Sequence, residues 1–208
     1  MIAHICNALS IIKEHRRAFI VLNIAFYGLF AISMTVTLFV PELHETAKLA
    51  MFEVLSQPGY MKAGADAYAG GHLLLAIGLT FVTNLGVSVV LTTLPSFVVP
   101  FSGILATLHR GALWGVLFAP IGPFRGTLIP HSLTLLLEGQ AYVLAAFAAY
   151  VQGQLILRPR HYGIGSRWEG YRAGAVTVAR IYVLIVLVLI VAAVYEGYDV
   201  IYLAPYFR

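Results

Sequence analysis

The sequence has little charge and almost no cysteine. Only 11% of its 208 residues are Asp, Glu, Lys or Arg, against about a quarter in a soluble domain. Cys6 is the single cysteine, so the chain can form no internal disulfide and has no pair of thiols for a metal. The HExxH motif, the GxSxG motif and the Gly-rich phosphate loop are also missing from the sequence. We therefore expect a protein that is not an enzyme.

Apolar residues, in contrast, make up 60% of the chain and form long runs. A membrane-spanning helix needs about 20 such residues. The runs predict an all-α, polytopic membrane helix bundle, a single domain over residues 1–208 with about five spans. The predicted spans are 18–40, 71–91, 97–119, 129–151 and 175–198. Two prolines, Pro95 and Pro100, interrupt the second long run, so residues 92–100 form either a tight turn or a re-entrant segment.

The basic residues lie at the ends of the apolar runs, which indicates membrane topology rather than a surface for nucleic acid. Seven of them fall on one predicted side and four on the other, which also carries most of the acids. The positive-inside rule then places the N-terminus in the cytoplasm and the protein in the cytoplasmic (inner) membrane. The seven are Lys13, Arg16, Arg17, Arg158, Arg160, Arg167 and Arg172, and the four are Lys48, Lys62, Arg125 and Arg208.

Two segments outside the spans are long enough to matter. Residues 42–57 have apolar positions at helical spacing between two prolines, which predicts an amphipathic helix on the outer surface. Residues 152–174 form a predicted cytoplasmic loop. This loop either docks a protein partner or anionic lipid headgroups, or it only enforces topology. Its docking candidates are Arg158, Arg160, Arg167, Trp168 and Arg172.

Ionisable groups inside a span are candidates for function because they usually face a bundle interior or a wet cavity. Asn84, Arg110 and Glu138 fall near the middle of three different predicted spans. We therefore expect Arg110 and Glu138 to form a buried ion pair, with Asn84 or Gln140 completing its hydrogen bonds. Such a cluster could fix helix packing, carry protons or a transported solute, or bind a lipid or cofactor.

A second polar layer is predicted nearer the outside, formed by His72, His131 and Glu196. Their spacing matches no metal motif, so we expect no metal site. A pigment or haem protein remains an alternative, with His109, His131 or His72 as axial ligand, although no cofactor is expected. Gly111 and Gly115 form a GxxxG motif where another helix could approach closely.

Three stretches resemble the stage II sporulation protein M family of multi-pass membrane proteins. "FVTNLGVSVVLTTL" is similar to the Asn-bearing second span of that family, and "IPHSLTLLLEGQAYVLAAFAAYVQG" to its Pro-His helix with an acidic residue. "ARIYVLIVLVLIVAAVYEGYDVIYLAP" resembles its last span, and "LHRGALWG" fits its third span more loosely. The residues that correspond are Asn84, His131, Glu138 and Glu196. The resemblance implies a membrane anchor that recruits other proteins, as the founding member does for cell-wall remodelling enzymes.

Taken together, these features predict a non-catalytic subunit or scaffold of a larger membrane complex. Its partners would be other membrane proteins or a second copy of the chain, together with lipids. The rival hypothesis is a transporter or permease subunit in which Glu138, Arg110 and His131 line a path. The two differ in one structural feature: a scaffold predicts a dry, fully paired cluster, whereas a transporter predicts a water-accessible cavity that reaches Glu138.

Overall fold

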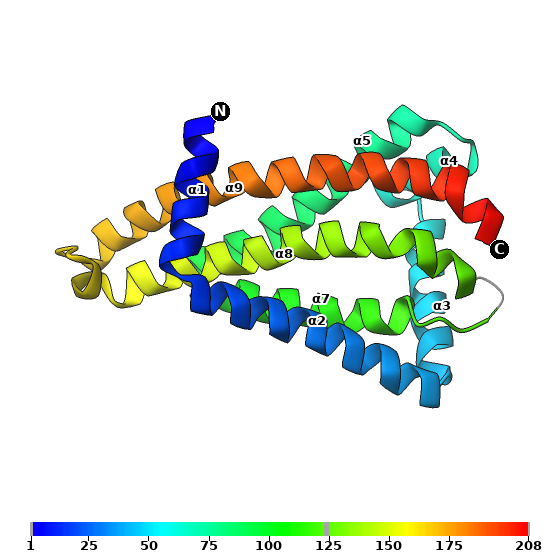
Figure 1. Cartoon of the computed structure of the whole chain (residues 1–208), viewed down its shortest axis with the longest axis horizontal. Coiled ribbons are helices and arrows are strands. Elements are labelled where there is room, and N and C mark those ends of the chain that lie inside the picture. Colours follow the sequence, from blue (N-terminus) through cyan, green and yellow to red (C-terminus); the bar gives the residue numbers. More distant parts are fainter. Residues whose placement is uncertain (1, 123–124, 208) are drawn as a thin grey trace.

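The computed structural model describes residues 2–122 and 125–207, and this part of the chain is helical without any strand. Long helices run side by side between two ends of an elongated bundle (Figure 1). The α-helices are α1 Ile2–Glu14, α2 Arg16–Phe39, α3 Glu42–Ser56, α4 Tyr60–Ala69, α5 Leu73–Gly86, α6 Leu94–Val98, α7 Ser102–Leu117, α8 Leu128–Leu157 and α9 Arg167–Tyr198. The π-helices are η1 Val87–Thr93 and η4 Asp199–Leu203, and the 3-10 helices are η2 Arg125–Thr127, η3 Pro159–Tyr162 and η5 Ala204–Phe207.

Four helical segments in the described ranges are long and apolar enough to cross a membrane. They are Arg16–Phe39, Leu73–Val98, Arg125–Leu157 and Arg167–Phe207. Large apolar side chains cover the outside of the bundle, as in Leu74, Leu105 and Ile24, each more than two-thirds exposed. Exposed apolar surface on this scale is typical of helices that face lipid. The structure therefore has the character of a helical membrane protein.

The second apolar run differs from its prediction. Helix continues from α5 through the π-helix η1 and α6 to Val98, past the predicted end of the span at residue 91. Pro95 lies in the first turn of α6, where a missing N–H is tolerated. A tight turn over residues 99–101 then reverses the chain, with Phe101 in the left-handed conformation at φ 71°. The segment 92–100 is thus helix followed by a turn.

The third predicted span, 97–119, corresponds to α7, which has only 16 residues. At 1.5 Å per residue it is about 24 Å long, less than the roughly 30 Å of a hydrocarbon core. This length is why four segments, and not five, meet the criteria of length and composition. In Figure 1, α7 nevertheless lies alongside α2 and runs between the same two ends of the bundle.

The connection between the last two spans is shorter than the predicted loop 152–174. Helix α8 extends to Leu157, and α9 begins at Arg167. Ser166 caps α9, because its side chain accepts a hydrogen bond from the backbone N–H of Glu169 at 3.2 Å. Three of the docking candidates, Arg167, Trp168 and Arg172, therefore lie on the first turns of a helix. The predicted amphipathic segment 42–57 corresponds to α3.

Helix α8 is the centre of the bundle. It packs against α2, α7 and α9, and 72% of the residues in its apolar stretch are buried, whereas only 11% are buried in the apolar stretch of α2. Small residues between Ala141 and Ala149 let the neighbouring helices approach. The GxxxG prediction on α7 is confirmed: a Cβ on Gly111 would lie 3.0 Å from the Phe26 ring, and one on Gly115 would meet the backbone of Phe30. Both contacts are with α2.

Candidate functional site

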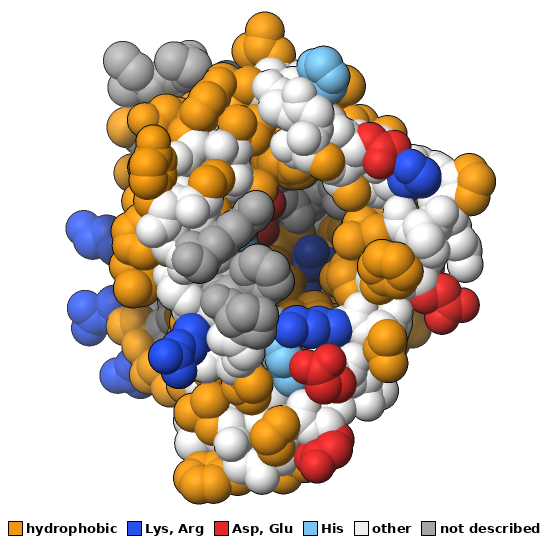
Figure 2. Space-filling view, turned by 90° about the vertical axis from the view of Figure 1, so that its right-hand side faces the viewer, with side chains coloured by type: hydrophobic (Ala, Val, Ile, Leu, Met, Phe, Trp, Pro, Cys, Tyr) orange, Lys and Arg blue, Asp and Glu red, His pale blue; other side chains and the backbone are white. Residues whose placement is uncertain are grey.

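A cavity of about 480 Å³ lies at the end of the bundle where α3 and α4 are found. Figure 2 looks onto this end and shows it hollowed, with basic and acidic side chains inside the hollow. Apolar side chains of α3 and α4 form part of the lining. The polar lining residues are Tyr60, Tyr68, Thr80, Thr83, Asn84, Arg110, His131, Glu138 and Glu196. A pocket of this size lies within the range of small-molecule binding sites.

Glu138 is buried at the inner wall of the cavity and is held by a side chain of a neighbouring helix. The Nδ2 of Asn84 on α5 donates a hydrogen bond to Oε1 of Glu138. The hydroxyl of Tyr142, one turn further along α8, donates to Oδ1 of Asn84 at 2.6 Å. The amide of Asn84 thus links the two α8 side chains and fixes its own orientation, because its oxygen accepts and its nitrogen donates.

A second carboxyl group faces the first. Glu196 on α9 lies within hydrogen-bonding reach of Glu138, and both line the cavity. Two carboxyl groups can share a hydrogen bond only when one of them carries the proton. Tyr68 on α4 lies beside this group in the lining of the cavity, and its hydroxyl is 2.7 Å from Oγ1 of Thr80. Burial is the main cause that raises the pKa of Tyr68, and the charge of Glu196 is the second. The hydroxyl therefore keeps its proton and can donate a hydrogen bond.

Arg110 does not form the predicted ion pair with Glu138. Its guanidinium carbon lies 4.3 Å from the ring centroid of Tyr142 and 5.2 Å from that of Trp114. These are cation–π distances, and the aromatic faces take the place of a carboxylate. In the described part of the chain Arg110 makes no ion pair, and its buried Nε has no hydrogen-bond acceptor. The guanidinium thus faces the cavity with an unused donor.

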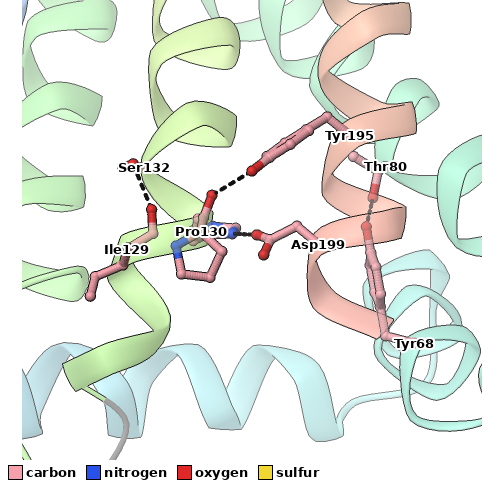
Figure 3. Close-up of polar contacts among 8 residues, drawn as sticks. Tyr68, Thr80, Ile129, Pro130, Ser132, Tyr195 and Asp199 are labelled. Carbon is pink, nitrogen blue, oxygen red and sulfur yellow. Dashed lines mark hydrogen bonds and ion pairs between the residues drawn. The ribbon is translucent and has the colours of Figure 1, made fainter. Parts of the chain in front are cut away.

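His131, at the start of α8, pairs with Asp199 on η4. Its Nδ1 lies 2.9 Å from Oδ2 of Asp199, which is fully buried and whose Oδ1 has no partner in the described structure. Figure 3 shows Asp199 pointing toward the start of α8, and next to it the hydroxyl of Tyr195 donating to the carbonyl of Pro130 at 2.9 Å. The two contacts tie the start of α8 to the end of the last span.

A smaller, basic pocket of about 140 Å³ adjoins the cavity, and we call it the vestibule. It is lined by His44, Lys48 and Arg125, and it shares two lining residues with the cavity, Phe118 and His131. The rings of this pair lie 5.1 Å apart and form the wall between the two spaces. His44 is buried, and its Nδ1 lies 2.9 Å from the carbonyl oxygen of Val116.

The remaining predicted site residues lie elsewhere. Gln140 is half-buried, does not line the cavity and has no hydrogen bond within the described ranges. His72 is exposed just before α5, and His109 is exposed on α7, so neither histidine joins His131. Residues 2–122 and 125–207 contain no group of three or more His, Cys, Asp or Glu side chains arranged to hold a metal.

The docking candidates lie around the α8–α9 connection, on exposed surface. They are Arg158, Arg160, Arg167, Trp168 and Arg172. The ring of Trp168 is stacked on that of Tyr171, with centroids 5.6 Å apart and planes 10° from parallel. Tyr171 in turn contacts Phe97 of α6 edge-on, at 5.4 Å. The exposed indole is therefore held in place by the bundle.

Sequence reasoning found Asn84, Arg110, Glu138, His131 and Glu196 but missed three residues of this site. Asp199 lies one residue past the predicted span 175–198, whereas helix continues through it. Tyr142 and Tyr68 were not singled out, because a tyrosine in an apolar run reads as a packing residue. One signal was available: Tyr142 follows Glu138 by one helical turn, so both lie on one face of α8.

Comparisons with known protein families, with curated proteins and with solved structures find no match to this chain. The fold and the site together define its class: a helical protein with membrane-spanning character and a polar, ionisable cavity at one end of its bundle.

Proposed function

We propose that this chain is a membrane transport protein, or a subunit of one, that binds a small polar solute in the cavity. The observation that carries the proposal is that the cavity reaches both Glu138 and Arg110. A scaffold whose polar cluster only fixes helix packing needs no such space, and its cluster would be fully paired. Here the guanidinium has a free donor, and two carboxyl groups lie within hydrogen-bonding reach of each other in the lining of the cavity.

The free-energy cost of burying charged groups also supports a transport function. Charged groups in the interior of a membrane bundle are expensive unless they are paired or hydrated, and they commonly mark substrate or proton paths. The Glu138–Glu196 pair can bind or release a proton without moving a helix, since the two carboxyl groups already lie within hydrogen-bonding reach. A solute whose binding changes the charge beside this pair would thereby be coupled to protonation.

We further propose five crossings with the N-terminus in the cytoplasm of the cell. The direction of α7 supports this count, because it runs between the same two ends as the longer helices (Figure 1). The seven basic residues near α1 and the α8–α9 connection support the orientation. In this topology the protein lies in the cytoplasmic membrane and the cavity opens to the outside.

Thiol labelling tests whether the cavity is hydrated. Starting from Cys6→Ser, which removes the only native thiol, one variant carries Leu79→Cys and its control carries Val82→Cys. Leu79 lines the cavity, whereas Val82, about 4.5 Å along the same helix, is 63% exposed on the outside of the bundle. A charged, membrane-impermeant reagent attacks thiolate, which does not form in lipid. We expect labelling of Leu79→Cys only; two equally inert variants would contradict the proposal.

The scaffold role and the resemblance to the sporulation protein M family are a second proposal. The stacked, exposed Trp168 with Arg167 and Arg172 beside it supports this role, since an aromatic among arginines suits an interface or anionic headgroups. A test is native mass spectrometry after gentle detergent extraction, in which the unchanged protein is compared with the variant Trp168→Ala. The variant keeps the other tryptophan, the buried Trp114. A specific protein or anionic lipid lost only from the variant would support docking; identical spectra would contradict it.

A further inference from the structure

The chemistry of the solute can be inferred from the cations that line the cavity and the vestibule. Arg110 has its guanidinium on two aromatic faces, and its buried Nε–H has no acceptor in the described structure. A buried donor without an acceptor costs free energy, and a guanidinium is best satisfied by a planar or tetrahedral oxyanion. A carboxylate or phosphate oxygen of a solute would supply such an acceptor to the guanidinium.

The vestibule supports the same chemistry independently. Its described lining contains two cationic side chains, Lys48 and Arg125, two imidazoles, and no carboxylate. The contact of His44 Nδ1 with a backbone carbonyl requires that Nδ1 carry the proton, which orients the ring. The nearest acidic neighbour of Lys48 is Glu45, at a loose 3.9 Å. Basic clefts of this kind raise the local concentration of anions.

The two spaces are arranged in series. Phe118 and His131 belong to both linings, and no other described residue does. His131 is held from behind by Asp199, so its ring can turn only if that contact breaks. A volume of about 140 Å³ is well above what a single water needs, and it is enough for one small oxyanion. The rings of Phe118 and His131 would therefore lie between an anion in the vestibule and the cavity.

We propose that the solute carries an oxyanion group, a carboxylate or phosphate, which the vestibule recruits and which binds to Arg110 in the cavity. This inference rests on the proposed transport function and names the solute class for the same site. The shared chemistry could be presented by a free anion in solution or by the headgroup of an anionic lipid. In both cases the oxygens accept hydrogen bonds from the guanidinium, while the Glu138–Glu196 pair remains the protonatable group beside it.

The test is protection of the cavity thiol by oxyanions. The Cys6→Ser, Leu79→Cys protein in detergent is labelled with a sulfonate-bearing methanethiosulfonate. Competitors are acetate, inorganic phosphate and, at equal ionic strength, tetramethylammonium chloride. We expect acetate or phosphate to slow labelling at least about threefold, while the quaternary ammonium salt does not. Phosphatidylglycerol added to the micelles is the second arm, and protection by it alone would identify a lipid headgroup as the source.

Variants show which side chains are needed for the protection by oxyanions. Arg110→Gln should abolish protection, and Lys48→Gln with Arg125→Gln should raise the concentration needed for half-protection. Lys48 and Arg125 are exposed, so their replacement leaves the fold intact even if Arg110→Gln does not fold. Rapid labelling that no oxyanion or anionic lipid slows, or that the ammonium salt slows equally, would overturn the inference. An inert Leu79→Cys would instead contradict the proposed function itself, so the two failures are distinguishable.

Discussion

The Nδ1 of His131 lies 2.9 Å from Oδ2 of Asp199, and this contact joins the first turn of α8 to the π-helical end of the last span. Asp199 is fully buried, and a buried carboxylate is stabilised only by a close donor or cation. His131 also forms half of the wall between cavity and vestibule. The contact therefore links the closure of the site to the packing of two long helices.

Removing the acceptor of this contact should destabilise the protein. We expect Asp199→Ala to lower the free energy of unfolding by about 1.5–3 kcal/mol, the usual range for a hydrogen bond with a charged partner. Asp199→Asn should lose less, because its amide oxygen can still accept from Nδ1. Thermal unfolding in detergent measures both, with Ser132→Ala on the exposed side of α8 as the control. Equal losses for Ala and Asn would contradict a specific hydrogen bond.

The bond between Tyr142 and Asn84 should contribute a small, measurable coupling energy. A double-mutant cycle of Tyr142→Phe and Asn84→Ala isolates the contact between the hydroxyl and Oδ1. Interhelical hydrogen bonds in membrane proteins average about 0.6 kcal/mol, so we expect a coupling near that value. The cycle is measured by unfolding in detergent. A coupling of zero would mean that Asn84 is held by Glu138 alone.

The close approach of α2 and α7 depends on Gly115. A Cβ at this position would meet Oγ of Ser33 and the carbonyl oxygen of Phe30, and backbone atoms cannot move aside cheaply. We expect Gly115→Ala to lower the unfolding temperature clearly, with a loss of about 1–3 kcal/mol, as for an overpacked core. Gly28→Ala is the matched control, because its Cβ would have no atom within 4 Å. That variant should be neutral or slightly stabilised.

The sequence predicts the depth of Asn84, Arg110 and Glu138 along their helices, but not the direction in which their side chains point. Counting residues along apolar runs predicts depth, and Asn84 and Glu138 do meet. Depth alone does not say which way a side chain points around its helix. Arg110 accordingly turned out to lie on the faces of Trp114 and Tyr142 and not on the carboxylate. Depth itself was wrong for Glu196, which was expected nearer the outside and yet lies within hydrogen-bonding reach of Glu138.

Helix boundaries were predictable only where the local signals are strong. The prolines at residues 95 and 100 suggested a break, yet the π-helix η1 carries the chain past residue 91, because Pro95 occupies a first turn that needs no N–H donor. The Ser166 cap on α9 was likewise hidden within an arginine-rich stretch that reads as a loop. Such details depend on contacts between segments far apart in the sequence.

Side-specific labelling of the cavity tests the central claim most directly. In sealed vesicles an impermeant thiol reagent is added to one face at a time. Three proteins with one thiol each are compared: the native chain with Cys6, and two Cys6→Ser chains that carry either Glu53→Cys on α3 or Leu79→Cys in the cavity. Cys6 on α1 and residue 53 on α3 are exposed and lie before and after the span α2, so in the proposed topology they mark the two sides of the membrane. We predict that Leu79→Cys reacts from the same side as Glu53→Cys and not from the side of Cys6. A cavity thiol that reacts from neither side would show a dry cluster, and the transport account would be wrong.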